Sequence, residues 1–338
     1  MTENSPINTP LSLALARTHH NPDGARRSHN AILDELRGDP RTHAILLRGT
    51  QLLAHSGELL YVPLIRVTQL AADAPLLYLG RTLTPLAGET EQQLPPDTPV
   101  IAVDLGSASS SRPTGRSDDT IGGPLSLGPG AEWMSLRELA HTLSSRDTGI
   151  AAQALAVTQW TTTTTHSPRT GERVHSVRAG WALSDGQGIH YPRTDPAVIV
   201  AVTDLDDRIL LANNHRNSPD RYSLIAGFVD PGESLEAAAA REVHEEADAR
   251  IHRIRYAGSQ PWPFPASLMV GFTAELFDTH PDAVRPDGIE IRDVRWFTRA
   301  ELREEVRHPQ RRITLPEHPS IARALIEQWN GAPLKDTP

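Results

Sequence analysis

One segment, Gly227 to Ala249, constrains the possible folds of this chain most, because it predicts a turn followed by a one-sided helix. It reads GFVDPGESLEAAAAREVHEEADA. The run from Asp230 to Glu233 is rich in turn-forming residues and precedes a predicted helix over about Ser234 to Asp248. At about 100° per residue, three carboxylates fall within an arc of roughly 100° on that helix, namely Glu242, Glu245 and Glu246. The other side, which we expect to face a core, carries Ala240, Val243 and Ala247.

Three carboxylates on one helix face repel each other, and two interpretations follow. Hard divalent cations such as Mg²⁺ and Mn²⁺ prefer carboxylate oxygen, so the face can be a metal site. Alternatively, it is the solvated acidic face of a surface helix, as charge runs often are. Arg241 can relieve part of the charge or pair with Glu233 in the preceding turn.

The spacing of the whole segment resembles the Nudix box. That pattern is Gly, five residues, Glu, seven residues, Arg-Glu, an aliphatic residue, any residue and Glu-Glu. The matching positions here are Gly227, Glu233, Arg241, Glu242, Val243, Glu245 and Glu246. The chain departs from the pattern at Asp248, where the family has Gly, and Ala249 stands in for a larger aliphatic residue. A left-handed conformation is common at such a helix end, and Asp tolerates it at a cost of ~1 kcal/mol.

A second segment, Ser259 to Ser267, reads SQPWPFPAS. Its prolines alternate with Trp262 and Phe264, which predicts a stiff, extended loop. Such a loop can hold a planar base and its ribose, or it can be a proline-rich strand connection with buried aromatic rings. The segment is similar to the SQPWPFPxS signature of the NADH pyrophosphatase branch of the Nudix family. The two motifs stand in the order that this branch has.

The resemblance implies metal ligands and catalytic residues. It assigns the metals to Glu242, Glu246 and Glu290, with Glu245 in the same cluster and the carbonyl of Ala226 as a further ligand. Arg241 and Glu233 belong to the same catalytic set.

The resemblance also implies a set of substrate contacts. From the second motif these are Gln260, Pro261, Trp262, Pro263, Phe264, Pro265, Ala266 and Ser267. Tyr191 resembles a substrate-contacting tyrosine, and Phe228 is its expected stacking neighbour. Ala322 matches a substrate-lining position in the last helix. Arg137 resembles a substrate-contacting arginine of the preceding domain, although a lone helical arginine is commonly a surface residue.

The absence of cysteine separates this chain from most of that branch, which carries a four-cysteine zinc ribbon between two domains. Ser167 and Thr170 stand where the first cysteine pair is expected, and no second pair of ligands follows near Leu183 to Gly186. Three nearby histidines, His166, His175 and His190, are not spaced as paired ligands. We therefore expect no zinc, and a ribbon that keeps its shape without metal or a looser linker.

The pattern of apolar runs and turns predicts four parts: a flexible segment at 1–38, an N-terminal Nudix-associated domain at 39–160, a degenerate zinc-ribbon linker at 161–193 and a catalytic Nudix domain at 194–332. Strands are predicted at 44–47, 59–65, 75–79, 100–103, 198–202, 209–212, 224–229, 267–275 and 294–297, helices at 135–160 and 320–330, and a long loop at 105–129. The expected fold class is α/β, a Nudix α/β/α sandwich after a smaller, mixed or mostly β domain.

The function implied by the resemblance is hydrolysis of the diphosphate bond of NADH or NAD⁺, with two or three Mg²⁺ or Mn²⁺ ions per site. The products are nicotinamide mononucleotide, reduced when the substrate is NADH, and AMP. The family also implies a homodimer. Two alternatives remain: removal of NAD caps from RNA, and a nonenzymatic nucleotide sensor. The formal net charge of −9 gives no support for a grip on RNA, no apolar run suits a bilayer and no signal peptide is evident, so we expect a cytoplasmic protein without membrane contact.

Overall fold

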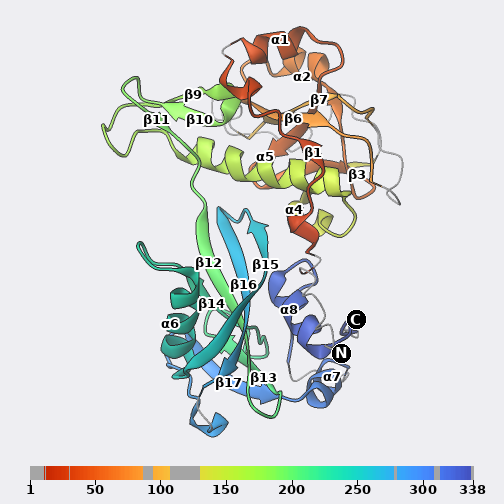
Figure 1. Cartoon of the computed structure of the whole chain (residues 1–338). Helices are drawn as coiled ribbons and strands as arrows, with labels where there is room; N and C mark the ends of the chain where they lie inside the picture. Colours follow the sequence, from red (N-terminus) through yellow and green to blue (C-terminus); the bar gives the residue numbers. More distant parts are fainter. Residues whose placement is uncertain are drawn as a thin grey trace, which may run out of the picture. The chain divides into compact units, whose positions relative to one another are not determined.

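The computed structural model describes residues 11, 13–29, 31–86, 94–106, 130–277, 280–307 and 313–335. The chain divides into two compact units, each described here by itself (Figure 1). The first contains Thr194–Trp262 and Ser267–Pro338, joined by the N-terminal residues through Ala14. The second contains Leu15–Arg193 and the short segment Pro263–Ala266. The division after Arg193 coincides with the start that the sequence predicts for the catalytic domain.

The C-terminal unit is built on a six-stranded mixed sheet with β12 at its centre. Its strands are β12 (Asp195–Thr203), β13 (Ile209–Asn214), β14 (Ile225–Phe228), β15 (Ile251–Trp262), β16 (Ser267–Leu276) and β17 (Ile291–Phe297). They lie in the order β15-β16-β12-β13-β17, and β14 pairs with β12. β12 is parallel to β16 and antiparallel to β14, and its residues 197–202 are all buried. A continuous apolar run of this kind suits a strand that is covered on both faces.

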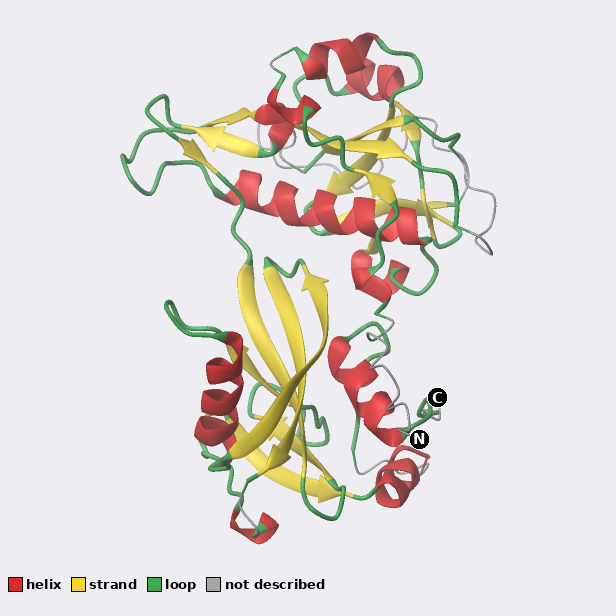
Figure 2. Ribbon diagram, viewed as in Figure 1, coloured by secondary structure: helices red, strands yellow, loops and turns green. Residues whose placement is uncertain are grey.

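Helices cover both faces of this sheet (Figures 1 and 2). α6 (Leu235–Ala247) packs on one face, over a core that includes Val198, Val200 and Phe272. α7 (Arg299–Arg307) and α8 (Ile321–Asn330) pack on the other, over a core that includes Ile199 and Tyr222. The alternation of Val198, Ile199 and Val200 between the two cores is the period of two of a β-strand. The predicted α/β/α sandwich is confirmed.

α6 begins and ends where the sequence predicts. The hydroxyl of Ser234 accepts a hydrogen bond from the backbone N–H of Ala237, and Asp248 ends the helix in the left-handed conformation, with φ 49°. The buried face of α6 is not quite the one that the sequence predicts. Ala239, Val243 and Ala247 are buried together with Ala238, whereas Ala240 is only half-buried. Ala239, Val243 and Ala247 follow one another at a spacing of four residues and therefore lie on one side of the helix. Ala240 lies at the edge of that buried side.

The second motif is mostly strand, which corrects the expectation of an extended loop. β15 runs through Trp262 and β16 begins at Ser267, so only Pro263–Ala266 form the turn of a long antiparallel hairpin. Neither β15 nor α7 was predicted. The half-exposed edge strand β15 lacks a continuous apolar run, because only one face and part of its length are covered.

The N-terminal unit is built on an eight-stranded sheet with the order β1-β6-β7-β2-β3-β4, in which β5 pairs with β2 and β8 with β3. Its strands are β1 (His20–Asn21), β2 (His43–Arg48), β3 (Gln51–His55), β4 (Glu58–Leu59), β5 (Val62–Pro63), β6 (Leu76–Thr82), β7 (Pro99–Asp104) and β8 (Ala131–Ser135). Its α-helices are α1 (Ile32–Gly38), α2 (Leu64–Leu70), α4 (Leu136–Leu139) and α5 (Ser145–Thr163). Short 3₁₀ turns lie at Ala14–Ala16, Arg26–Ser28 and Arg178–Gly180 here, and at Pro281–Ala283 in the C-terminal unit.

Two predictions for the N-terminal unit need correction. The predicted helix 135–160 is two helices, because Ser135 and Glu138 form a capping box that starts α4 and Ser144 caps a new helix, α5. The predicted flexible segment 1–38 is ordered where it is described. Leu13 and Leu15 are buried, and α1 places Ile32 and Leu36 in the core. Residues 1–10 and most of the predicted loop 105–129 lie outside the described residues.

The segment 161–193, predicted as a degenerate zinc ribbon or a looser linker, contains a small sheet. Three short antiparallel strands, β9 (His175–Val177), β10 (Ala182–Ser184) and β11 (Ile189–His190), form its sheet. At its base, one carboxylate oxygen of Asp185 accepts a hydrogen bond from Thr170 Oγ1 at 3.2 Å and lies 3.1 Å from His190 Nε2. The other oxygen accepts from the backbone N–H groups of Gln187 and Gly188. A hydrogen bond with Ser167 is the main cause that holds the pKa of Asp185 below its usual range.

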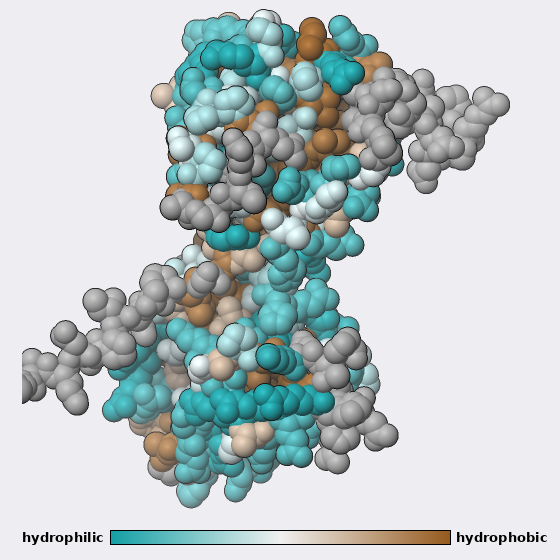
Figure 3. Space-filling view, turned by 90° about the vertical axis from the view of Figure 1, so that its right-hand side faces the viewer, coloured by the Kyte–Doolittle hydropathy of each residue, from teal (hydrophilic) through white to brown (hydrophobic). Residues whose placement is uncertain are grey.

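The described surface is mainly hydrophilic on the face drawn in Figure 3, where apolar side chains show as separate patches. Within the described part of the chain, none of the helices combines the length and the apolar character that crossing a membrane requires.

Candidate active site

Arg241 is the structural centre of the acidic helix face. Its Nε and Nη2 donate to the two carboxylate oxygens of Glu233 at 2.9 and 2.8 Å. Its Nη1 donates to Glu242 at 2.8 Å and to Glu245 at 3.0 Å, and Nη2 also donates to the carbonyl of Phe228 at 2.9 Å. An arginine has five N–H donors, and all five are engaged here. The predicted pairing of Arg241 with Glu233 is confirmed.

Glu246 is the buried carboxylate of the cluster, with 6% of its surface exposed. Burial is the main cause that raises its pKa to about 8, and the negative charges of Glu242, Glu290, Asp287 and Glu245 contribute in that order. Burial also raises the pKa of Glu242, against the hydrogen bonds from Arg241 that lower it. A carboxylate buried among other carboxylates is a place where positive charge is stabilising.

Glu290 reaches the cluster from a turn that precedes β17. The carboxylate of Asp287 accepts hydrogen bonds from the backbone N–H groups of Glu290, at 3.0 and 3.2 Å, and of Ile291, at 2.8 Å. The backbone N–H of Asp287 in turn donates to the carbonyl of Glu246 at 3.2 Å. Asp287 therefore fixes Glu290 next to α6. Sequence reasoning missed Asp287, although the Asp-Gly pair at 287–288 is a turn signal.

A pocket of about 260 Å³ opens beside Glu246. Its lining comes from β13, β14, the loop between them, α6 and the start of β17: Ala212, Asn214, Arg216, Asn217, Ser223, Leu224, Ala226, Glu246 and Ile291. Ala226 and Glu246 both belong to this lining. The carbonyl of Ala226 as a metal ligand remains a prediction. Asn214, Arg216 and Asn217 were not predicted as site residues, because the polar loop that carries them has no motif of its own.

The donor set suits a hard cation, since all its side-chain ligands are carboxylate oxygens. In the arrangement seen here, however, no three acidic or histidine side chains of the described residues converge as a ready-made metal site. Arg241 contacts three of the carboxylates, Glu233, Glu242 and Glu245, and occupies the position of a counter-cation. Glu290 nevertheless lies near enough for its charge to raise the pKa of both Glu242 and Glu246.

The hairpin β15–β16 places the residues of the second motif in different surroundings. Gln260 is fully buried, and its Nε2 donates to the carbonyl of Pro319 at 2.6 Å. Its Oε1 accepts from the backbone N–H of Ile321 at 2.8 Å. The amide of Gln260 thus anchors the start of α8, next to Ala322. Contact of Gln260 with a substrate remains a prediction, and in this structure its polar atoms serve the protein.

The turn of the hairpin contacts the N-terminal unit, to which it is assigned. The guanidinium of Arg137 lies over the ring of Phe264, 4.4 Å from its centroid. Gln159 of α5 donates a hydrogen bond to the carbonyl of Pro263 at 2.8 Å. Arg137 therefore contacts the second motif, and its contact with a substrate remains a prediction. Gln159 was not predicted, because no signal in the sequence marks a partner 104 residues away.

Phe228 and Tyr191 both present exposed rings, 60% and 56% exposed. Arg178 lies over the ring of Tyr191 at 5.4 Å. The two rings belong to different units, so their stacking remains a prediction.

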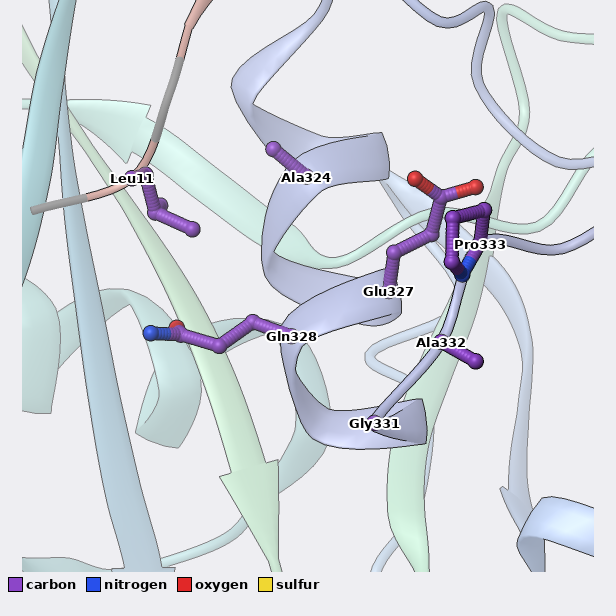
Figure 4. A pocket seen from close by; sticks show the side chains of 7 residues that line it. All are labelled: Leu11, Ala324, Glu327, Gln328, Gly331, Ala332 and Pro333. Carbon is purple, nitrogen blue, oxygen red and sulfur yellow. The ribbon is translucent and has the colours of Figure 1, made fainter. Parts of the chain in front are cut away.

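A second pocket, of about 390 Å³, lies beside the C-terminal part of α8 (Figure 4). Leu11, Ala324, Glu327, Gln328, Gly331, Ala332 and Pro333 line it. Its one charged residue, Glu327, is already paired with Arg323 at 2.8 Å. This lining offers neither a set of metal ligands nor a cation for phosphate.

Two family models of known proteins match two separate parts of the chain. The family model of the NUDIX domain matches residues 193–317. A second family model, described as an NADH pyrophosphatase-like rudimentary NUDIX domain, matches residues 41–160.

Two similar proteins agree with this match, and one solved structure is reported beside them. NAD-capped RNA hydrolase NudC of Mycobacterium bovis is 39% identical over 207 residues, which cover 59% of this chain and 66% of that protein. The protein of the same name from Stutzerimonas stutzeri is 38% identical over 204 residues, which cover 60% of this chain and 68% of that protein. The crystal structure of a NUDIX hydrolase from Nitrosomonas europaea is 26% identical, with a TM-score of 0.38, and covers 50% of this chain and 94% of that one. The chain belongs to the Nudix hydrolase family, in its NudC-like branch.

Proposed function

We propose that this protein hydrolyses the diphosphate bond of NADH or NAD⁺ and releases nicotinamide mononucleotide, reduced when the substrate is NADH, and AMP. The observation that carries the proposal is the position of Glu246. This buried carboxylate lies in the wall of a pocket and within the electrostatic reach of Glu242, Glu245 and Glu290. Such a group of hard oxygen donors suits a diphosphate substrate that arrives with divalent cations.

Members of the Nudix family generally use divalent metal ions such as Mg²⁺ or Mn²⁺. Glu242, Glu246 and Glu290 would hold them here, with Glu245 and the carbonyl of Ala226 as further donors. When bound, such ions neutralise the diphosphate and lower the pKa of a water molecule. We propose two or three ions per site.

The chain's own residues have distinct tasks in this proposal. Arg241 orients Glu233, Glu242 and Glu245 through its five hydrogen bonds. Asp287 holds Glu290 beside α6. A carboxylate of the cluster accepts the proton of the attacking water. The motif at 259–267, with Arg137, Tyr191, Phe228 and Ala322, binds the nucleoside parts of the substrate.

The test is incubation of the purified protein with NADH and Mn²⁺, followed by chromatography for AMP. We expect AMP and reduced nicotinamide mononucleotide in equal amounts. Omission of the metal, with EDTA present, should abolish both products. Binding of NADH without AMP release in saturating Mn²⁺ or Mg²⁺ would instead identify a nucleotide sensor.

A second candidate is removal of NAD caps from RNA, because the similar proteins from M. bovis and S. stutzeri are named NAD-capped RNA hydrolases. The same bond is cleaved in both reactions. Competition between NADH and an NAD-capped RNA of known sequence distinguishes them, since a capped-RNA enzyme has the higher kcat/KM for the RNA. We further propose a homodimer, to be checked by light scattering, and a cytoplasmic location, to be checked by cell fractionation.

A further inference from the structure

The diphosphate of the proposed substrate needs cationic partners, and the arginine of the box is not available for this task. All five N–H donors of Arg241 bind protein oxygens, and its ion pairs with Glu233, Glu242 and Glu245 raise its pKa. To bind a phosphate oxygen, Arg241 would have to give up one of these bonds. Any cationic side chain that binds the phosphates alongside the metal ions is therefore a different residue of the chain.

Arg216 is the one cationic residue in the lining of the pocket beside Glu246. Among the residues that the structure describes, none forms an ion pair with it, and its side chain is exposed. The remaining polar lining consists of Asn214, Asn217 and Ser223, which are neutral, and Glu246. The volume of about 260 Å³ is below the roughly 300–1,000 Å³ of sites that enclose a drug-sized ligand. It is suited to a part of a dinucleotide, and the part that belongs beside the carboxylates is the diphosphate.

The loop that carries Arg216 is fixed on both sides of this residue. Asn213 is fully buried, and its Nδ2 donates to the carbonyls of Ser218, at 2.9 Å, and Arg221, at 2.7 Å. The backbone N–H of Arg216 donates to Asn214 Oδ1 at 2.9 Å. The N–H of the preceding residue, His215, donates to the carbonyl of Glu290 at 2.8 Å. A loop held in this way loses little backbone entropy when Arg216 binds a ligand.

We propose that Arg216 binds the phosphate oxygens of the substrate and is the chain's own cationic contact to the diphosphate. The inference rests on the proposed function, because it takes a diphosphate to be the ligand of this pocket. A guanidinium can bind two phosphate oxygens at once through parallel N–H bonds, which also fixes the orientation of the diphosphate. Arg216 thereby determines how the scissile bond lies against Glu246.

The test compares three variants, Arg216→Ala, Arg216→Lys and Arg221→Ala. Arg221 lies in the same loop and carries the same charge, but its side chain does not line the pocket, so it is the matched control. With saturating Mn²⁺, we expect Arg216→Ala to lower kcat/KM for NADH by about 10- to 100-fold and Arg216→Lys to fall between it and the wild type. Arg221→Ala should stay within about twofold of the wild type, and all three should keep the wild-type melting temperature, since both positions are exposed.

Calorimetric binding of ADP in Mn²⁺ separates this inference from the proposed function, because ADP has the diphosphate without the nicotinamide half. We expect the Kd of ADP to rise about tenfold or more in Arg216→Ala and not in Arg221→Ala. If the wild type cleaves NADH and Arg216→Ala equals it in both assays, the inference is wrong and the function stands. If the wild type leaves NADH intact while Arg216→Ala loses ADP binding, the function is wrong and the inference stands. Wild-type protein that does not bind ADP at all overturns the inference.

Discussion

Gly227 lies directly against the carboxylate of Glu242. A Cβ atom on Gly227 would fall 2.0 Å from Glu242 Cδ and 2.1 and 2.2 Å from its two oxygens. Gly227 lies on β14 and Glu242 lies on α6, so the first glycine of the box makes room for a carboxylate that follows it by 15 residues. The glycine is required here by close approach of a side chain and not by its backbone conformation, since its φ is not positive.

Replacement of Gly227 by alanine should move Glu242 and leave the fold intact, because the clashing atoms are the end of a flexible side chain. A shift of about 1 Å in a catalytic group can cost on the order of 100-fold in rate, and we expect a loss of about that size in AMP release from NADH. Gly24→Ala is the control, since a Cβ there meets nothing within 4 Å. A Gly227→Ala protein with the wild-type rate would show that the position of Glu242 does not matter for catalysis.

Glu246→Gln should preserve the structure and lose hydrolysis. The amide has the shape of the carboxylate but removes one hard anionic ligand from the pocket wall, and we expect a fall in kcat of about 100- to 1,000-fold. Glu236→Gln makes the same chemical change in the first turn of the same helix and should leave the rate unchanged. Near-normal turnover of Glu246→Gln in saturating Mn²⁺ would refute the assignment of the metal site.

The segment 161–193 should be stable without zinc, because the carboxylate of Asp185 holds its loops together by hydrogen bonds. Elemental analysis of the purified protein should find no stoichiometric zinc, and EDTA should not lower the melting temperature. Asp185→Asn should lower it, because the carboxylate accepts hydrogen bonds from Thr170, Gln187 and Gly188. About one zinc per chain, or unfolding by the chelator, would point to the histidines as ligands.

The stabilisation by Asp185 should depend on pH in a defined direction. Its pKa is held below the usual range, chiefly by the hydrogen bond with Ser167, so the folded state favours the ionised form. The contribution is therefore complete above the pKa of about 4 of an unfolded aspartate and is lost as the pH falls through the lower folded value. The difference in melting temperature between wild type and Asp185→Asn should be constant from about pH 5 to 7 and shrink below pH 4. A difference that grows on acidification would contradict this account.

Replacement of Trp262 and Phe264 by alanine together should weaken substrate binding more than chemistry. Phe264 is held under the guanidinium of Arg137 in the hairpin turn, where both can contact a nucleoside. Loss of one or two aromatic contacts of about 1 kcal/mol each predicts a rise of roughly 10-fold in the KM for NADH, with a smaller fall in kcat.

Two controls belong to this double variant. Its melting curve must match the wild type, because removal of core aromatic rings alone can destabilise a fold by about 3–5 kcal/mol. The Kd of ADP, which has no second nucleoside, should change less than the KM for NADH. Equal effects on both ligands would mean that the hairpin turn does not select the substrate.

The sequence determined those features that depend on neighbours within a few residues. The spacing of Glu242, Glu245 and Glu246 places them on one helix face in any α-helix, and Ser234 and Asp248 cap that helix wherever it packs. Pairing of Arg241 with Glu233 was predictable because the turn that ends at Glu233 leads directly into the helix that carries Arg241. The apolar runs of the sheet were visible for the same reason, since a strand buried on both faces needs an unbroken run.

Only the tertiary structure decided the environment of these residues. Glu246 is buried in a pocket wall that it shares with residues of β17 and of the loop after β13, and burial together with the neighbouring carboxylates raises its pKa to about 8. Asp287 and Arg216 join the site from positions 41 residues after and 30 residues before Glu246. Gln260 became an anchor for α8 because Pro319 and Ile321 lie opposite it, some 60 residues further on. Desolvation and hydrogen bonding between distant segments depend on which strands pair and which helices cover them, and no local pattern of residue types encodes that choice.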